Sequence, residues 1–154
     1  MIGCIVRSAD FERVLRSRSR ASSAHFALHH LADAPSRGKP VRQPTEIHQL
    51  STGCLALRSS TVDDTPPQGL WLGAVVPKRH ARRSVTRNLI KRQIRAAIGR
   101  HADHLPAGLW VVRLRVAFDR AHFTSAASDE LKQASRAELE QILIAVSRPR
   151  TTCL

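Results

Sequence analysis

The feature that most constrains this chain is a long interval without acidic residues. Between Asp64 and Asp103 there is no Asp or Glu, although the chain contains 12 of them. A helix in this interval cannot form the opposite-charge pairs, four residues apart, that stabilise a solvated helix. Its cations repel one another unless anionic groups such as phosphates lie against them. Nine of the 25 Lys and Arg residues lie here: Lys78, Arg79, Arg82, Arg83, Arg87, Lys91, Arg92, Arg95 and Arg100.

Residues 82–101 have the pattern of a helix with two different surfaces. An apolar stripe at helical spacing is expected to face a sheet, and it consists of Ile90, Ile94, Ala97 and His101. Cations four residues apart line up along another side. That side carries Arg87, Lys91 and Arg95, flanked by Asn88 and Arg92. Lys78 and Arg79 end the preceding apolar segment and lead into this helix, so the sequence predicts a cationic strip suited to phosphate oxygens.

Apolar periodicity predicts the other elements. We expect a short helix at 8–16 that Ser8 caps, and a long helix at 128–146 that begins at Ser128. Strands are expected at 25–31, 70–76 and 109–116, with a weaker one within 47–57 that ends in 54–57, while 33–43 and 59–69 read as loops. In the strand at 109–116, the residues expected to face inward are Trp110, Val112, Leu114 and Val116.

This element order predicts an α+β fold, with a small mixed sheet of about four strands packed with helices. Residues 1–154 are interpreted as a single domain with a loop-rich insertion at 33–68. The net charge of +13 points to a polyanionic partner, and the apolar share of 42% is enough for a core. No signal peptide or apolar membrane span is recognised, so we expect a cytoplasmic protein.

Metal sites and catalytic constellations are not predicted. Cys4, Cys54 and Cys153 are widely spaced and odd in number, which disfavours a zinc site or a disulfide framework. The adjacent His29 and His30 would point to opposite faces of a strand. No Ser-His-Asp order or paired carboxylates stand out, and acidic residues are too scarce to suggest a protein-only metal nuclease. We therefore predict no catalytic residue and no metal ligand in this chain.

Two stretches of the sequence resemble the signature of the bacterial ribonuclease P protein component. The first is Gly73-Ala74-Val75-Val76-Pro77-Lys78-Arg79, and the second is Ser84-Val85-Thr86-Arg87-Asn88-Leu89-Ile90-Lys91-Arg92-Gln93-Ile94-Arg95. Asp10-Phe11-Glu12-Arg13-Val14 is similar to the N-terminal Phe-x-x-Val helix of the family. The resemblance extends to the strand from Trp110 and the final helix, and it leaves out about 33–68.

This resemblance implies a fold with an unusual left-handed βαβ crossover. It also implies the protein subunit of ribonuclease P, an endoribonuclease that removes the 5′ leader of precursor tRNA. The catalytic RNA would carry the phosphodiester hydrolysis with Mg²⁺. The expected partners are that RNA and precursor tRNA, with no membrane and no protein partner.

The resemblance also assigns candidate binding residues. The expected contacts to the RNA subunit are Lys78, Arg79, Arg87, Asn88, Lys91, Arg92 and Arg95. Phe11, Phe26 and His29 are expected to bind the single-stranded leader in a groove between the sheet and the N-terminal helix. The chain departs from the family at four positions. Leu89 replaces the second Arg of the family's Arg-Asn-Arg motif, Leu15 and His29 replace further aromatics, and Trp71 stands where an Arg is common.

Two alternatives remain open at the level of the sequence. A basic strip also suits a ribosome-associated or DNA-binding module unrelated to tRNA processing. An anionic membrane surface is a third partner, although it would require bulky apolar residues opposite the strip. Ile90 and Ile94 supply some of these, but a core requires them too.

Overall fold

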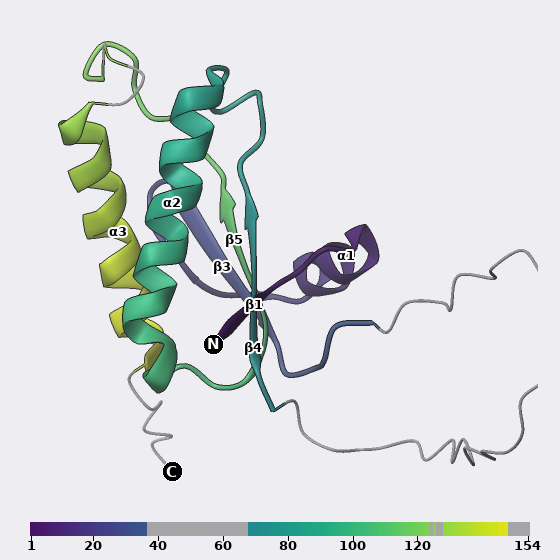
Figure 1. Ribbon diagram of the computed structural model, residues 1–154. Helices are drawn as coiled ribbons and strands as arrows, with labels where there is room; N and C mark the ends of the chain where they lie inside the picture. The colour runs from purple at the N-terminus through teal and green to yellow at the C-terminus, as the bar shows by residue number, and fades with distance from the viewer. Residues whose placement is uncertain (37–67, 124, 126–127, 148–154) are drawn as a thin grey trace, which may run out of the picture.

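The computed structural model describes residues 1–36, 68–123, 125 and 128–147. It forms one mixed sheet with three α-helices (Figure 1). The elements are β1 (Ile2–Cys4), α1 (Ser8–Arg16), β2 (Ser19–Ser22), β3 (Phe26–Leu31), β4 (Leu70–Val75), α2 (Ser84–His101), the short 3₁₀ helix η1 (Ala102–His104), β5 (Gly108–Leu114) and α3 (Asp129–Ser147). The α+β class is confirmed. The weak strand predicted within 47–57, most of the predicted insertion and the C-terminal residues after 147 lie outside the described residues.

The sheet has five strands in the order β1-β4-β5-β3-β2, where the sequence predicted about four. The two unpredicted strands, β1 and β2, lie at its edges. They are only three and four residues long, and β2 consists of Ser19-Arg20-Ala21-Ser22, without an apolar face. Their strand geometry comes from pairing with β4 and β3, which a local pattern does not reveal.

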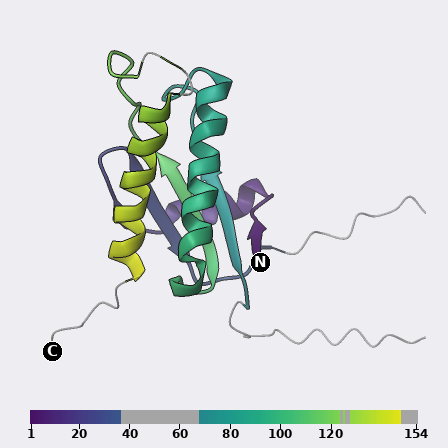
Figure 2. The same ribbon diagram turned by 60° about the vertical axis from the view of Figure 1, so that its left-hand side comes forward.

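The parallel pair β4–β5 is joined by α2, whereas β3 pairs antiparallel with β5. Figure 2 views the sheet from its helical side: β4 lies to the right of β5, both strands run upward, and α2 descends in front of them. The β4–α2–β5 crossover is therefore left-handed, as the family resemblance implied. Right-handed crossovers are the strong general rule, so periodicity alone would have given the wrong hand.

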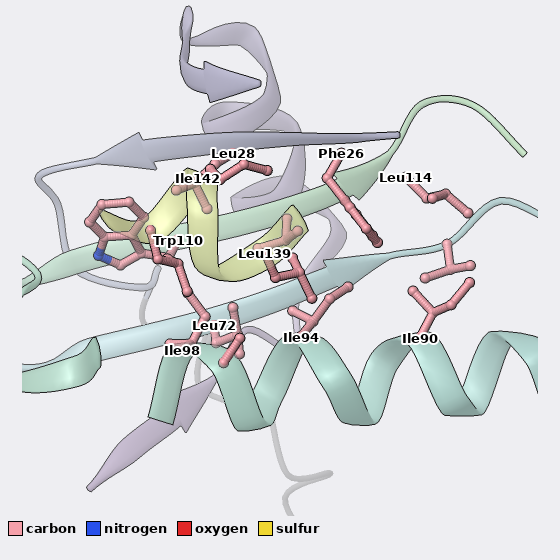
Figure 3. Close-up of a cluster of buried hydrophobic side chains, with 14 of the residues drawn as sticks. Phe26, Leu28, Leu72, Ile90, Ile94, Ile98, Trp110, Leu114, Leu139 and Ile142 are labelled. Atoms are coloured by element: carbon pink, nitrogen blue, oxygen red, sulfur yellow. The ribbon is translucent and has the colours of Figure 1, made fainter. Parts of the chain in front are cut away.

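The sheet separates two apolar clusters. Helices α2 and α3 cover one face and form the larger core, while α1 lies on the opposite face (Figures 1 and 3). The fully buried side chains of the larger core include Phe26, Leu28, Ile90, Ile94, Ile98, Trp110 and Leu114. Val14 of α1 packs with Leu109 and Val111 in the smaller cluster. Both faces of the central strands are thus covered, which explains their continuous apolar sequences.

Strand β5 shows how the alternation works. Trp110, Val112 and Leu114 face α2 and α3, as predicted, and Leu109 and Val111 face α1. The prediction for Val116 was wrong, because β5 ends at Leu114 and the side chain of Val116 is 50% exposed.

The predicted helix ends and apolar stripes were partly correct. Ser128 accepts a hydrogen bond from the backbone N–H of Leu131 at 3.2 Å, as expected of an N-cap. The predicted cap at Ser8 was wrong, since α1 already includes Ser8 and has no side-chain cap. In α2, Ile90, Ile94 and Ala97 are buried as predicted, but Ile98 completes the stripe in place of His101.

The chain leaving β3 is attached to α1. The buried carboxylate of Asp10 accepts hydrogen bonds from the backbone N–H of Ser36 at 3.1 Å and from its hydroxyl at 2.5 Å. Arg13 pairs with Asp33 and also donates to the carbonyl of Ala34. The start of the predicted insertion is therefore held against the N-terminal helix.

We expect two Gly→Ala substitutions to have opposite effects on stability. At Gly108, φ is +131°, and an added Cβ would lie 2.5 Å from the carbonyl oxygen of Leu31, so Gly108→Ala should destabilise the fold by roughly 1–3 kcal/mol or more. The matched control is Gly99→Ala on the exposed surface of α2, where nothing lies within 4 Å of the added atom. It should stabilise by about 0.5–1 kcal/mol. Urea denaturation of both variants checks the prediction, and equal effects would contradict it.

Candidate nucleic-acid interface

The cationic residues predicted from the sequence lie on the surface of α2 and on the segment that precedes it. The apolar stripe of α2 is buried against the sheet, so its polar residues are turned toward solvent. Lys78, Arg79, Asn88, Arg92 and Arg95 are exposed, and Lys91 is half-buried. Burial of the stripe thus turns the α2 members of this set, Asn88, Lys91, Arg92 and Arg95, toward the outer side of the helix, while Lys78 and Arg79 lie in the segment before it.

Arg87 differs from the other predicted contacts. One nitrogen of its guanidinium group, Nη1, donates to the carbonyl oxygen of Ala81 at 3.0 Å and to that of Arg82 at 2.7 Å. These bonds brace the turn that connects β4 to α2, and Arg87 is half-buried. Its position at the start of the predicted strip therefore has a structural role in addition to its charge.

Several of the described carboxylates are engaged in contacts away from the cationic strip. Glu138 accepts hydrogen bonds from Ser23 at 2.7 Å and from the backbone N–H of His25 at 3.2 Å, and it pairs with the His25 imidazole. Asp10 is occupied by Ser36. Within the described residues, no carboxylate forms an ion pair with Lys78, Arg79, Arg87, Lys91, Arg92 or Arg95. The positive charge of the strip is therefore left uncompensated by the described chain.

Arg100 is the exception among the basic residues of α2. It pairs with Glu140 of α3, which also contacts Nε2 of His101 at 2.5 Å. The hydrogen bond from His101 lowers the pKa of Glu140 below its ordinary value, with the adjacent Arg100 adding to the effect. This cluster ties the C-terminal turn of α2 to α3. The strip available to a ligand therefore ends before Arg100.

A hollow of about 700 Å³ lies where the β4–α2 turn meets the segment after β5. Its lining includes Arg79, Arg82, Arg83, Arg120, Phe118 and Phe123, with a single carboxylate, that of Asp119, among these four arginines. The sequence analysis counted Arg82 and Arg83 in the acid-free interval but assigned them no contact. Arg120 was missed, and no local signal could have found it, because only the fold brings it into the hollow that Arg79 also lines. The hollow extends the positive surface past the start of α2.

A second hollow, of about 480 Å³, lies between α2 and the start of α3. Asn88 and Arg92 line it together with Asp129 and Lys132. The predicted strip is therefore divided, with Asn88 and Arg92 beside α3. Lys91 and Arg95 follow a different line along the helix.

The predicted leader-binding residues lie on both faces of the sheet, not one. Phe11 of α1 packs over Gly73, where an added Cβ would be 2.3 Å from Cε1 of its ring. His29 also belongs to the α1 face, and its Nδ1 hydrogen-bonds to the carbonyl of Ser17 at 3.1 Å. Phe26 has no exposed surface and points into the core below α2 and α3. Its predicted role in stacking a base is wrong, because the register of β3 turns it away from α1.

The described residues offer neither a metal-binding cluster nor a membrane-spanning helix. No cluster of three or more His, Cys, Asp and Glu side chains there is arranged to hold a metal ion. Among the helices of that part of the chain, none combines the length and apolar character needed to cross a bilayer.

A five-stranded mixed sheet with an uncompensated cationic helix on one face defines a small basic α+β protein suited to contact a polyanion. Residues 4–143 match the family model described as Ribonuclease P. The chain therefore belongs to the ribonuclease P protein family. This membership does not support the alternative of a ribosome-associated or DNA-binding module unrelated to that family.

Individual relatives agree with this assignment. The chain is 40% identical over 85 residues to a "Ribonuclease P protein component" of Bordetella parapertussis, a match that covers 55% of this chain and 65% of the relative. It thus spans slightly under two thirds of that relative's length. A protein of the same name from Burkholderia mallei is 26% identical over 144 residues, which cover 94% of this chain and 82% of the relative.

A solved structure shows the same fold. The RNase P protein of Staphylococcus aureus superposes with a TM-score of 0.54 at 21% identity, covering 92% of this chain and 93% of the other. A second structure of the S. aureus protein gives a TM-score of 0.52 at 20% identity, with 97% and 93% coverage.

We expect the contact between α2 and α3 to weaken in acid. Because the folded pKa of Glu140 lies below its ordinary value of 4.5, the unfolded chain binds more protons than the folded chain as the pH falls past 4.5. The stability from this contact is therefore present above 4.5 and lost below it. Urea unfolding of the wild type and Glu140→Gln should show a stability difference at neutral pH that shrinks progressively as the pH falls below 4.5. Glu12→Gln on exposed α1 is the control, and a difference independent of pH would contradict the prediction.

Proposed function

We propose that this chain is the protein subunit of a ribonucleoprotein endoribonuclease that removes the 5′ leader of precursor tRNA. A catalytic RNA carries the hydrolysis of the phosphodiester bond, and the protein binds RNA. The observation that supports this most directly is the uncompensated cationic surface of α2 in a chain that belongs to the ribonuclease P protein family. The proposed compartment is the bacterial cytoplasm.

In this proposal the cationic strip binds the RNA subunit. Arginine forks bind phosphate oxygens in bidentate fashion, and the Asn88 amide can both donate and accept hydrogen bonds. Arg87 shapes the turn through the carbonyls of Ala81 and Arg82, which sets the positions of its cationic neighbours. The proposed contacts are Lys78, Arg79, Arg87, Asn88, Lys91, Arg92 and Arg95.

The single-stranded leader of precursor tRNA is assigned to the sheet face that carries α1. Phe11 offers a half-buried ring there, and His29 offers a flat imidazole held by the Ser17 carbonyl. Stacking of bases on such rings tolerates every base, which suits leaders of varied sequence. Phe26 is excluded from this set by its burial.

Mg²⁺ is assigned to the RNA subunit. The ion prefers several oxygen ligands, often carboxylates. The carboxylates of Asp10, Glu138 and Glu140 are instead engaged by protein donors, so they do not fit a magnesium site held by this chain. The chemistry supplied with Mg²⁺ is activation of the water that attacks the phosphodiester.

Reconstitution tests the proposed function. The purified chain, mixed with a bacterial ribonuclease P RNA at a Mg²⁺ concentration too low for the RNA alone, should restore cleavage of precursor tRNA at the 5′ end of the mature sequence. Gel analysis of the products measures both the rate and the site of cleavage. Failure to restore cleavage, or equal affinity of the chain for duplex DNA and for structured RNA, would overturn the proposal.

Removal of one exposed cation should change the salt dependence of RNA binding. Arg92→Ala is expected to weaken binding of the RNA subunit and to reduce the slope of log K against log salt by about one, because one fewer counterion is released. Arg136→Ala removes the same charge from the exposed surface of α3 and serves as the control. Titrations at several salt concentrations provide the measurement. An unchanged slope for Arg92→Ala would remove this residue from the interface.

A further inference from the structure

Trp71 lies on the sheet face that carries α1, next to the residues of the smaller apolar cluster. In β4, Leu70 and Leu72 point into the larger core, and Trp71, between them, points the other way. Its side chain remains partly exposed, whereas the other tryptophan of the chain, Trp110, has no exposed surface. The sequence analysis gave Trp71 no role beyond noting that it departs from the family.

Two glycines make room for the indole of Trp71. A Cβ added at Gly3 of the neighbouring strand β1 would lie 2.3 Å from Cδ1 and 2.7 Å from Nε1. A Cβ added at Gly69 would lie 3.1 Å from Cη2 at the opposite end of the ring system. The indole therefore rests across the backbone of both residues, with its five-membered ring near Gly3 and its six-membered ring near Gly69.

Phe11 packs in a similar way over a third glycine, further along the same face of β4. It packs over Gly73, which lies two residues after Trp71 in β4 and faces the same side. Residues two apart on a strand are separated by roughly 6.5 Å along its axis. Two aromatic side chains thus lie in succession on this face, each supported by a backbone position without a side chain.

We propose that Trp71 stacks an unpaired base of the RNA that binds this face, and that it extends the aromatic surface begun by Phe11. The ligand class is a single-stranded RNA segment, and the indole accepts any base because every base has a π-face. Trp71 thereby supplies aromatic surface that Leu15 lacks, and its indole is larger than the imidazole of His29. Identification of the segment with the leader of precursor tRNA rests on the proposed function, whereas stacking itself does not.

Tryptophan fluorescence tests the stacking directly. The probes are oligouridylate and oligoadenylate of about eight nucleotides, within the usual site size for single strands. Both should quench the emission of the wild-type protein. In Trp71→Phe only the buried Trp110 emits, so RNA should leave the emission unchanged while binding is partly retained. Trp71→Ala should bind about fivefold more weakly or worse.

A second variant keeps the indole of Trp71 but changes the backbone position against which it packs. Gly3→Ala places a methyl group 2.3 Å from Cδ1 of Trp71, which forces the indole to shift, so it should also weaken binding of the oligonucleotides. Val116→Ala, an exposed apolar position beyond the end of β5, is the control and should bind as the wild type does. Circular dichroism and thermal melting establish that each variant is folded. A folded Trp71→Ala protein with wild-type affinity, or RNA binding without quenching, would overturn the inference.

The leader assignment is tested in the reconstituted holoenzyme. Trp71→Ala should weaken the binding of precursor tRNA and leave the binding of leaderless tRNA unchanged. An equal loss for both RNAs would overturn the assignment of Trp71 to the leader. Failure of the wild-type holoenzyme to cleave precursor tRNA would instead count against the proposed function, and the oligonucleotide titrations would still decide whether Trp71 stacks a base.

Discussion

Burial of the apolar stripe of α2 against the parallel strands β4 and β5 is the contact on which the rest of the structure depends. Ile90, Ile94 and Ile98 are at most 1% exposed, and full burial of such a side chain stabilises a fold by about 1.5–3 kcal/mol. The same contact fixes the rotation of the helix about its axis. Figure 3 shows Ile90, Ile94 and Ile98 pointing from α2 toward the strands. Because the stripe can face the sheet in only one orientation, the cations between its members must face outward.

The distribution of acidic residues follows from this arrangement. Glu138 joins α3 to the β2–β3 turn through Ser23 and His25, and Glu140 joins α3 to the end of α2. These carboxylates stabilise contacts between elements instead of neutralising the strip. The like charges along α2 therefore repel one another in the free protein, and a polyanion that binds there relieves this repulsion. The carboxylate contacts of α3 therefore stabilise the fold, whereas the cations of α2 without a described carboxylate partner attract RNA.

The two faces of the sheet are built differently. The face below α2 and α3 is filled by large apolar side chains, whereas the face below α1 has glycines at positions 3, 69 and 73 that leave space for aromatic rings. Phe11 and Phe26 illustrate the consequence. Both are phenylalanines that the family resemblance assigned to the leader, but Phe26 lies on the filled face and is fully buried. Alternate side chains of a strand point to opposite faces, and the position of Phe26 in β3 places it on the filled face. Sequence similarity did not reveal this.

The sequence by itself determined the elements with strong local patterns. The acid-free helix, the apolar strands β4 and β5 and the Ser128 cap could be predicted because periodicity, charge and capping act within a few residues. Only the tertiary structure decided the edge strands β1 and β2, the burial of Phe26 and the presence of Arg79 and Arg120 in one hollow. The left-handed crossover was implied by the family resemblance and not by any local pattern. These features depend on pairing and packing between segments far apart in the chain. No local pattern in a single segment carries that information.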